Sequence, residues 1–255
     1  MIASSLFHFT GDHLNILKIL EGKSLRASFN IETVQDFFPN KKFIATPMVC
    51  FCDIPLKFIS RDHTKRYGSY GIGFKKDWGI KNKVSPILYR LEQSGFSNSF
   101  LNSSFELNTI IERLEGLKML YGESDSEILD IQYMVGALHS HSENMAGFIK
   151  SYEELYKGQN RNNYIDREWR WVHERTKKEF HDKDDEDYRK RLNIKYHKNP
   201  DYLFFEIDDL NYLVVKEKKD IDLMMDKIRK LSLSEVEKFA LVQKIIDIDS
   251  INSDM

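Results

Sequence analysis

The fold is constrained most by one apolar run in the first quarter of the chain, Pro47-Met48-Val49-Cys50-Phe51-Cys52-Asp53-Ile54-Pro55-Leu56. Its centre, Val49 to Cys52, is typical of a strand that is buried within a sheet. Pro55 suits the first turn of a helix, because its fixed φ is compatible with that position and its missing N–H is not needed there. The run therefore predicts a buried strand followed directly by a helix towards Tyr67, with Gly68 as the stop signal.

Tyr70 to Phe74 is predicted as the next strand. Gly71 and Gly73 alternate on one of its faces, so that face carries no side chains at these positions. A bare face allows a flat ligand or another backbone to approach closely. Tyr67 and Tyr70 flank the intervening turn, and an exposed ring there can act as a stacking platform for a heteroaromatic ring, with ordinary packing at a strand edge as the alternative.

The rest of the chain predicts an α+β fold in a single domain, residues 1–255, with a helical insertion at about 97–160 and C-terminal helices at about 219–247. Apolar residues recur at helical spacing between Phe105 and Tyr156, which indicates a pair of helices. The other expected elements are a strand at Leu6–Phe9, a helix capped by Asp12 and ended by Gly22, and strands at Val84–Leu91, Tyr164–Val172, Leu203–Ile207 and Tyr212–Val215.

Composition excludes several classes of protein. Of the 255 residues, 41% are hydrophobic and 13% aromatic, which excludes a disordered chain. No apolar run approaches the roughly 20 residues that span a bilayer, and no secretory signal is visible, so we expect a cytoplasmic protein without a membrane partner. The formal net charge of −2 gives no global basic field of the kind that drives sequence-independent binding to nucleic acids.

Glu168 is a candidate catalytic carboxylate. Residues Tyr164 to Val172 alternate in the manner of a strand, so Glu168 and Arg170 are predicted to share one face. A carboxylate in an aromatic, buried strand needs a partner, and Arg170 supplies one. The pattern leaves a structural ion pair and a catalytic role open. Asp166 is expected on the same face, where it can raise the pKa of Glu168 or orient a substrate.

His8 is a candidate ligand-binding residue. It lies between two phenylalanines on the first predicted strand, so its ring can face a cleft while Phe7 and Phe9 face the core. An imidazole in that place can donate to a ribose hydroxyl, and the alternative is a hydrogen-bonded core histidine. Thr10, at the end of the same strand, suits ligand binding or an ordinary turn.

Two other kinds of site are weaker interpretations. Cys50, Cys52 and His63 offer too few thiolates in too apolar a run for a metal site, which favours buried structural thiols. The spacing from Arg167 to His173 fits the loose motif of HEPN nucleases. That motif requires a helix, whereas the residues between them alternate as in a strand.

Three segments together carry a resemblance to a known family. Leu6-Phe7-His8-Phe9-Thr10, the Pro47 to Leu56 run and Tyr67-Gly68-Ser69-Tyr70-Gly71-Ile72-Gly73-Phe74-Lys75-Lys76-Asp77-Trp78 resemble the AbiGi family of bacterial abortive-infection proteins. The resemblance implies a role in phage defence. It also implies a partner encoded in the same operon, a nucleotidyltransferase-like toxin for which such proteins have been labelled the antitoxin.

The same segments also look like those of the ADP-ribosyltransferase fold, a split antiparallel sheet that grips NAD in a cleft. The resemblance implies that His8 and Thr10 bind a ribose, that Tyr70 with Tyr67 shapes the nicotinamide pocket, and that Glu168 is catalytic. NAD is then the co-substrate, and a nucleic acid or a protein is the acceptor. The alternative is a non-catalytic module that restrains the toxin through the helical segment or through the charged stretch from Lys177 to Lys195.

Overall fold

The structure of this chain is a computed structural model that describes residues 3–34, 42–59, 61–122, 126–156, 159–173, 179–181 and 186–253. Nine strands of this part form the main sheet, and six other strands pair outside it. The main sheet comprises β1 (Ser5–Thr10), β3 (Ser28–Thr33), β4 (Phe43–Cys52), β5 (Tyr70–Lys75), β6 (Ser85–Pro86), β11 (Glu168–Trp171), β12 (Glu179–His181), β14 (Leu210–Val215) and β15 (Ile245–Asp247). The short pairs are β2 (Ser24–Arg26) with β13 (Tyr202–Phe204), β7 (Leu88–Arg90) with β8 (Ile149–Ser151), and β9 (Glu153–Tyr156) with β10 (Gln159–Asn162).

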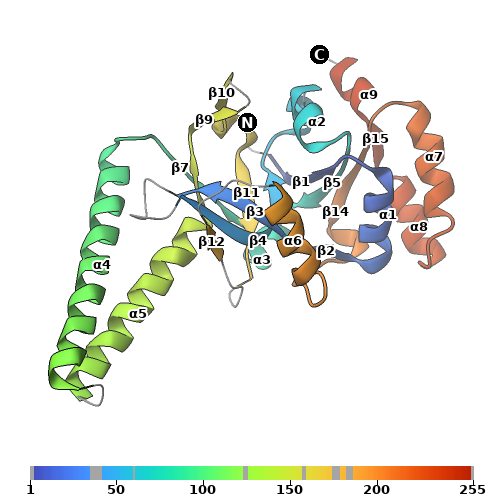
Figure 1. The fold of residues 1–255 in the computed structure, drawn as a ribbon. Coiled ribbons are helices and arrows are strands. Elements are labelled where there is room, and N and C mark those ends of the chain that lie inside the picture. Colours follow the sequence, from blue (N-terminus) through green and yellow to red (C-terminus); the bar gives the residue numbers. More distant parts are fainter. Residues whose placement is uncertain are drawn as a thin grey trace.

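Helices surround this sheet (Figure 1). They are α1 (His13–Gly22), α2 (Arg61–Tyr67), α3 (Lys76–Lys81), α4 (Gly95–Tyr121), α5 (Ser126–Ala146), α6 (Glu186–Tyr196), α7 (Lys219–Ile228), α8 (Glu235–Val242) and α9 (Ile248–Ser253). Three single turns of 3-10 helix are η1 (Leu56–Phe58), η2 (Tyr164–Asp166) and η3 (Ile207–Asp209). Among the described residues, no helix has the length and apolar character needed to cross a membrane.

The chain has the α+β class expected from the sequence, with a mixed sheet. The strand order is β15-β14-β5-β1-β4-β11-β6, and β3 and β12 pair with the first half of β4. Within the sheet, β14 and β15 are parallel, whereas the other neighbouring pairs are antiparallel. The expectation of a wholly antiparallel sheet is therefore wrong at this one edge.

Strand β4 organises the sheet because two strands share one of its edges. Strand β3 pairs with residues 43–48 of β4, whereas β1 meets β4 only where Phe7 lies opposite Cys52. Strand β1 instead pairs along its whole length with β5. The sheet consequently opens between β1 and β4.

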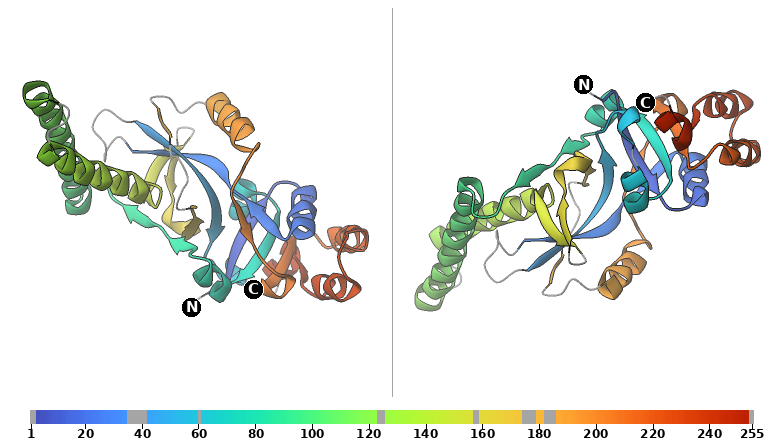
Figure 2. Two further views of the ribbon diagram at one scale, coloured as in Figure 1. Left: turned by 90° about the horizontal axis from the view of Figure 1, so that it is seen from below. Right: turned by 90° about the horizontal axis from the view of Figure 1, so that it is seen from above.

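The two faces of the sheet are covered differently. On one face, Leu6, Ile72 and Phe74 belong to a large core that includes side chains of α1, α7 and α8. On the other face, Phe7 and Cys52 pack in a smaller core that includes α9. Seen from below and above, α7 and α8 lie at one end of the molecule and the α4–α5 hairpin lies at the opposite end (Figure 2).

Local signals near the N-terminus are confirmed. The Asp12 carboxylate accepts a hydrogen bond from the Leu14 N–H at 2.9 Å and so caps α1. The helix ends at Gly22, and the left-handed residue that follows it is Lys23. Strands β1 and β5 match the predicted strands within one residue at each end.

Several predicted elements are shorter than expected or are broken. The helix expected from Pro55 to Tyr67 is divided into η1 and α2, and the strand expected at Val84–Leu91 is divided into β6 and β7. The strand expected at Leu203–Ile207 is β13, which pairs with β2 outside the main sheet. Within the strand expected at Tyr164–Val172 only Glu168–Trp171 is a strand, because η2 and a left-handed Arg167 precede it.

The bare face predicted at Gly71 and Gly73 is covered by aromatic rings. The Phe9 ring lies over Gly71, and the rings of Phe7 and Tyr212 lie over Gly73. Phe7 stacks on Phe9 and on Tyr212 with ring centroids 5.9 and 6.1 Å apart. These rings occupy the space that the sequence interpretation reserved for a flat ligand.

Replacing Gly68 by Ala is expected to destabilise the fold. Gly68 has φ +105°, and a Cβ there would collide with the backbone of Thr10 at the end of β1. We expect the free energy of unfolding to fall by at least about 2 kcal/mol, measured by urea denaturation. Gly11→Ala is the matched control, because no atom beyond its two chain neighbours lies within 4 Å of its Cβ position. Equal stability of the two variants would contradict the expectation.

Candidate functional site

A cavity of about 420 Å³ lies where the sheet opens between β1 and β4. Side chains of β1, β3, β4 and β11 line it, together with residues of α2, β8, β9 and β10. Polar side chains predominate in its wall, and those used below are His8, Asn30, Glu32, Tyr67, Lys150, Arg161 and Glu168. Three of the residues predicted from the sequence, His8, Tyr67 and Glu168, therefore line one cavity.

His8 bridges the opening between the two strands. Its Nδ1 lies 2.9 Å from the carbonyl oxygen of Cys50, on the stretch of β4 that β1 leaves unpaired. A carbonyl can only accept, so Nδ1 carries the proton of this hydrogen bond. Burial lowers the pKa of His8, although the bond to Cys50 acts in the opposite direction. The ring is thus neutral at pH 7, and Nε2 is an acceptor rather than the donor that the sequence interpretation expected.

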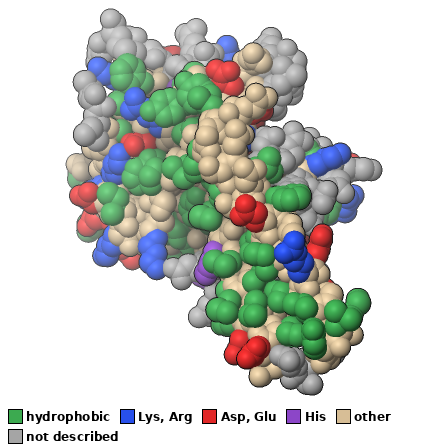
Figure 3. Space-filling model, turned by 90° about the vertical axis from the view of Figure 1, so that its left-hand side faces the viewer, with side chains coloured by type: hydrophobic (Ala, Val, Ile, Leu, Met, Phe, Trp, Pro, Cys, Tyr) green, Lys and Arg blue, Asp and Glu red, His purple; other side chains and the backbone are tan. Residues whose placement is uncertain are grey.

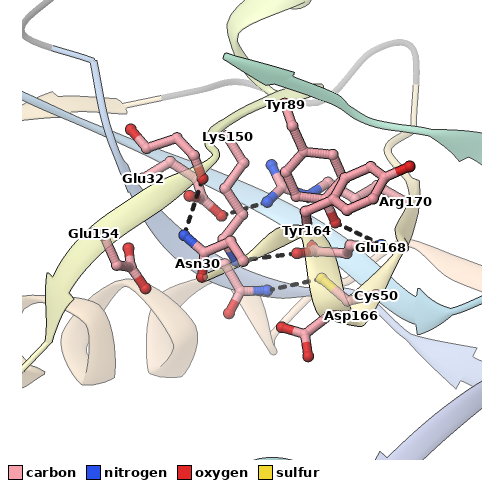
Figure 4. Close-up of polar contacts among 12 residues, drawn as sticks. Asn30, Glu32, Cys50, Tyr89, Lys150, Glu154, Tyr164, Asp166, Glu168 and Arg170 are labelled. Atoms are coloured by element: carbon pink, nitrogen blue, oxygen red, sulfur yellow. Dashed lines mark hydrogen bonds and ion pairs between the residues drawn. The ribbon is translucent and has the colours of Figure 1, made fainter. Parts of the chain in front are cut away.

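Glu168 lies in a cluster of buried charges (Figure 4). Its Oε1 accepts a hydrogen bond from Nε of Arg170 at 2.7 Å, and its Oε2 accepts one from Nζ of Lys150 at 3.0 Å. Arg170 also donates to the carboxylate of Glu32. The hydroxyl of Tyr89 accepts from the backbone N–H of Glu168 at 2.7 Å. The shared face of Glu168 and Arg170 is therefore confirmed as a direct ion pair.

The charges around Glu168 keep it ionised. Burial alone would raise the pKa of Glu168, but the cations of Arg170 and Lys150 outweigh burial and hold this pKa far below its ordinary value of 4.5. Burial likewise opposes the charge of Lys150, and the carboxylates of Glu32 and Glu168 keep its pKa above the ordinary value. The expectation that a neighbouring carboxylate raises the pKa of Glu168 is thus wrong.

Asp166 belongs to a second polar cluster instead. It lies in η2, before β11 begins, so it does not alternate with Glu168 along a strand. Its buried carboxylate accepts hydrogen bonds from the Tyr67 hydroxyl and, at 3.2 Å, from Arg161. Burial, followed by the charge of Asp166, raises the pKa of Tyr67, so this hydroxyl stays protonated.

Thr10 and Tyr70 lie outside the cavity that contains Glu168. Thr10 lines an adjoining cavity of about 420 Å³, and its hydroxyl accepts from the side-chain amide of Asn15 at 2.9 Å. Tyr70 is paired with Thr10 in the sheet, its ring lies 5.7 Å from that of His13, and its hydroxyl contacts Asp220 of α7. The structure therefore does not bring Tyr70 to Glu168.

The strand register places His8 and Glu168 on different faces of the sheet. Glu168 lies opposite Cys52, and Cys52 lies opposite Phe7, so these three side chains share a face. His8 follows Phe7 directly in β1, so its side chain leaves the strand on the opposite face of the sheet. Both side chains reach the same cavity because the sheet is open between β1 and β4.

The structure gives no support to a metal site or to a HEPN motif. Burial raises the pKa of both Cys50 and Cys52, so their thiols stay protonated and are poor metal ligands. Among the described residues, no group of three His, Cys, Asp or Glu is arranged to hold a metal ion. Between Arg167 and His173 the chain forms strand β11, Glu168–Trp171, rather than the helix that the HEPN motif requires.

Sequence reasoning missed Glu32, Lys150 and Arg161. Glu32 was detectable, because Phe29 and Ile31 alternate with polar residues in the strand β3 that carries it. Lys150 and Arg161 lie on short strands after the helical pair and have no comparable local pattern. They join the site through tertiary contacts alone.

Comparisons with known proteins point to one family. A family model described as "Putative abortive phage resistance protein AbiGi, antitoxin" matches residues 25–216. The abortive phage resistance protein AbiGi of Lactococcus lactis subsp. cremoris is 25% identical over 230 residues, which covers 82% of this chain and 88% of that protein. No solved structure matches the chain.

The stability of the fold is expected to depend on pH through Glu168. Because the pKa of Glu168 lies below 4.5, its ionised form stabilises the folded chain above that pH, and the stabilisation is lost as the pH falls further. At about pH 7, Glu168→Gln should lower the free energy of unfolding by about 3–5 kcal/mol, because it leaves buried cations uncompensated. Below about pH 4.5 the difference from wild type should narrow by up to about 1.4 kcal/mol per pH unit.

Urea denaturation of both proteins at several pH values measures this difference. Glu112→Gln, at an exposed position of α4, is the matched control and should change stability by less than about 0.5 kcal/mol. A Glu168→Gln variant as stable as the control at neutral pH would show that the charge cluster contributes nothing to folding.

Proposed function

The chain belongs to the AbiGi family of abortive phage resistance proteins, and on that premise we propose that it acts as an NAD-consuming ADP-ribosyltransferase with a nucleic acid or a protein as acceptor. One observation carries the proposal. The ionised carboxylate of Glu168 and the acceptor nitrogen of His8 belong to side chains that line a single cavity at the opening of a sheet.

The architecture supports the proposal at the level of the fold. The resemblance noted in the sequence implies a sheet that is split at the ligand cleft, with the histidine on the first strand and the glutamate on a later one. In this chain β1 leaves β4 after a single paired position, and β11 lies on the other edge of β4. The positions of His8 on β1 and of Glu168 on β11 support the proposed fold.

The residues of two adjoining cavities suit NAD. The cavity with Glu168 and the cavity with Thr10 share His8 and Phe9, and each has about 420 Å³. Together they fall within the range of roughly 300–1,000 Å³ found for small-molecule sites. Lys18 and Arg26 line the second cavity and supply positive charge suited to a diphosphate. NAD, when bound, supplies the ADP-ribose group that is transferred.

Glu168 is suited to the chemical step. Breaking the bond between nicotinamide and ribose builds positive charge on the sugar, which a fixed carboxylate in a cavity of low dielectric stabilises. Two oxygens offer about four lone-pair sites, so the bonds to Arg170 and Lys150 leave room to accept a ribose hydroxyl. Arg170 and Lys150 then hold the carboxylate in position.

His8 is suited to ribose binding through its tautomer. Because Nδ1 donates to Cys50, Nε2 can accept a hydrogen bond from a sugar hydroxyl. Tyr67 lines the same cavity and takes the ring position that the resemblance gave jointly to Tyr67 and Tyr70. Its hydroxyl is held by Asp166 and Arg161, which fixes the ring.

A second candidate function is that of a non-catalytic, antitoxin-like module that binds and restrains a nucleotidyltransferase-type toxin. Two observations favour it. The matching family model carries the word antitoxin, and both carboxylate oxygens of Glu168 are already engaged by cations. Two contact surfaces are proposed for it. The structure describes the two helices α4 and α5 of the first surface, whereas residues 177–178 and 182–185 of the charged stretch from Lys177 to Lys195 lie outside the described residues.

Glu168→Gln is expected to abolish transfer but to leave NAD binding largely intact. The amide keeps the shape of the side chain and loses the charge that stabilises the transition state. We expect nicotinamide release to slow by at least about 100-fold and the NAD dissociation constant to change by less than about threefold. If the single variant does not fold, the double variant Lys150→Met/Glu168→Gln replaces it in the assay, because it removes one charge of each sign and so leaves no additional unpaired cation. Full activity in a folded variant would exclude Glu168 as the catalytic residue.

His8→Ala is expected to weaken NAD binding by about three- to tenfold, because one hydrogen bond to the sugar is lost. Calorimetric titration of NAD into wild type and variant measures this effect, with the urea midpoint of each checked first. Tyr70→Phe is the matched control, because its hydroxyl meets Asp220 outside the cavity. Saturable binding weakened only by His8→Ala supports the cavity. An absence of binding up to millimolar NAD favours the antitoxin-like module.

A further inference from the structure

The α4–α5 hairpin exposes an unusual amount of apolar surface. Thirteen of the 26 exposed large hydrophobic side chains in the described part of the chain lie on these two helices, so the surface is concentrated there. Tyr133 is 80% exposed, Met119 88% and Leu120 77%. The helices pack against each other and extend away from the main sheet (Figure 1). No helix or strand in the described part of the chain covers their outer sides.

Seven of these side chains form one face, called here the hairpin face. On each helix they recur at spacings of three, four or seven residues, which places them along a single stripe. Leu114, Ile128 and Val135 are buried, and they fix which side of each helix turns inward. Because the helices are antiparallel, the two stripes lie on the same side of the hairpin. The members are Ile110, Leu117 and Tyr121 of α4, and Ile131, Met134, Leu138 and Met145 of α5.

The hairpin face exposes at least as much apolar area as the largest patch on a typical monomer. Figure 3 shows hydrophobic side chains gathered over the protruding helices. The seven side chains of the hairpin face are between 39% and 70% exposed. At roughly 150–250 Å² for each large side chain, they expose on the order of 500–900 Å² together. The largest contiguous apolar patch on a typical monomer is about 300–600 Å² and is often functional.

The charges of the hairpin define what can cover it. Helices α4 and α5 contain six acidic residues and two basic ones. By helical spacing, Glu106, Glu127 and Asp130 border the hairpin face, with Arg113 as the base on the same side. If a second copy of this chain docked on the hairpin face, the acidic borders of the two copies would meet, and their repulsion would disfavour the dimer. A surface with lysine or arginine along its edges is complementary instead.

We propose that the hairpin face docks a partner protein through an amphipathic helical surface whose apolar stripe is bordered by lysine and arginine. Two antiparallel helices with a shared apolar side leave a groove that one further helix can fill, as in a helical bundle. The docking surface is independent of the transferase proposal, because its residues lie outside the two cavities that were assigned to NAD.

A pair of labelled synthetic peptides tests the docking surface by fluorescence anisotropy. Both are helical heptad peptides with leucine at the a and d positions, and they carry either lysine or glutamate at the e and g positions. We expect saturable one-to-one binding of the lysine peptide and binding of the glutamate peptide at least about tenfold weaker. Binding of the lysine peptide should weaken with added salt.

Two double variants locate the binding. Met134→Asp/Leu138→Asp changes the hairpin face, and Val236→Asp/Phe239→Asp makes the same change in charge on exposed positions of α8. We expect only the hairpin variant to lose binding, by at least about tenfold. Equal loss in both variants, or no binding of the lysine peptide to wild type, overturns the proposal. A dimer in sedimentation that the hairpin variant alone dissociates identifies a second copy as the occupant and also overturns it.

Discussion

The buried guanidinium of Arg170 is the interaction on which this structure depends. Arg170 is wholly inaccessible to solvent, and a buried charge is tolerated only with good partners on several sides. It meets Glu168 on its own strand, Glu32 on β3 and, at 2.8 Å, the carbonyl oxygen of Gly147 just after α5. One side chain thereby joins three segments that are far apart in the sequence. The wall of the cavity is a consequence of satisfying that charge.

The same contacts connect the cavity with the helical hairpin. Gly147 and Lys150 follow directly on α5, and both contact the Glu168–Arg170 pair. The backbone N–H of Leu88, in the strand before α4, donates to the carbonyl of Phe148 at 2.8 Å, so both ends of the insertion are anchored at the cavity. A displacement of α5 at its C-terminal end would change the partners of Glu168. A protein bound to the hairpin face is therefore in a position to influence the carboxylate.

Sequence patterns predicted the local features well and the long-range ones poorly. The Asp12 cap, strand β1 and the shared face of Glu168 and Arg170 each depend on residues close in sequence, and each is confirmed. The strand alternation predicted for the residues before Glu168 is wrong. Asp166 lies in a 3-10 turn, where its carboxylate contacts Tyr67, about 100 residues away in sequence. Lys150 and Arg161 lie on short strands and reach the site only through tertiary contacts, for which a single sequence contains no local signal.

The structural role of His8 is compatible with the ligand-binding role proposed for it. Where β1 leaves β4, the carbonyl of Cys50 has no strand partner from β1, and a buried carbonyl without a hydrogen bond costs about 1–3 kcal/mol. The imidazole satisfies that carbonyl in place of a backbone N–H. In doing so it fixes its own tautomer, with the unprotonated nitrogen available to a ligand. A core histidine and a ligand-binding histidine, which the sequence presented as alternatives, are thus compatible at this position, because the hydrogen bond to Cys50 occupies Nδ1 and not Nε2.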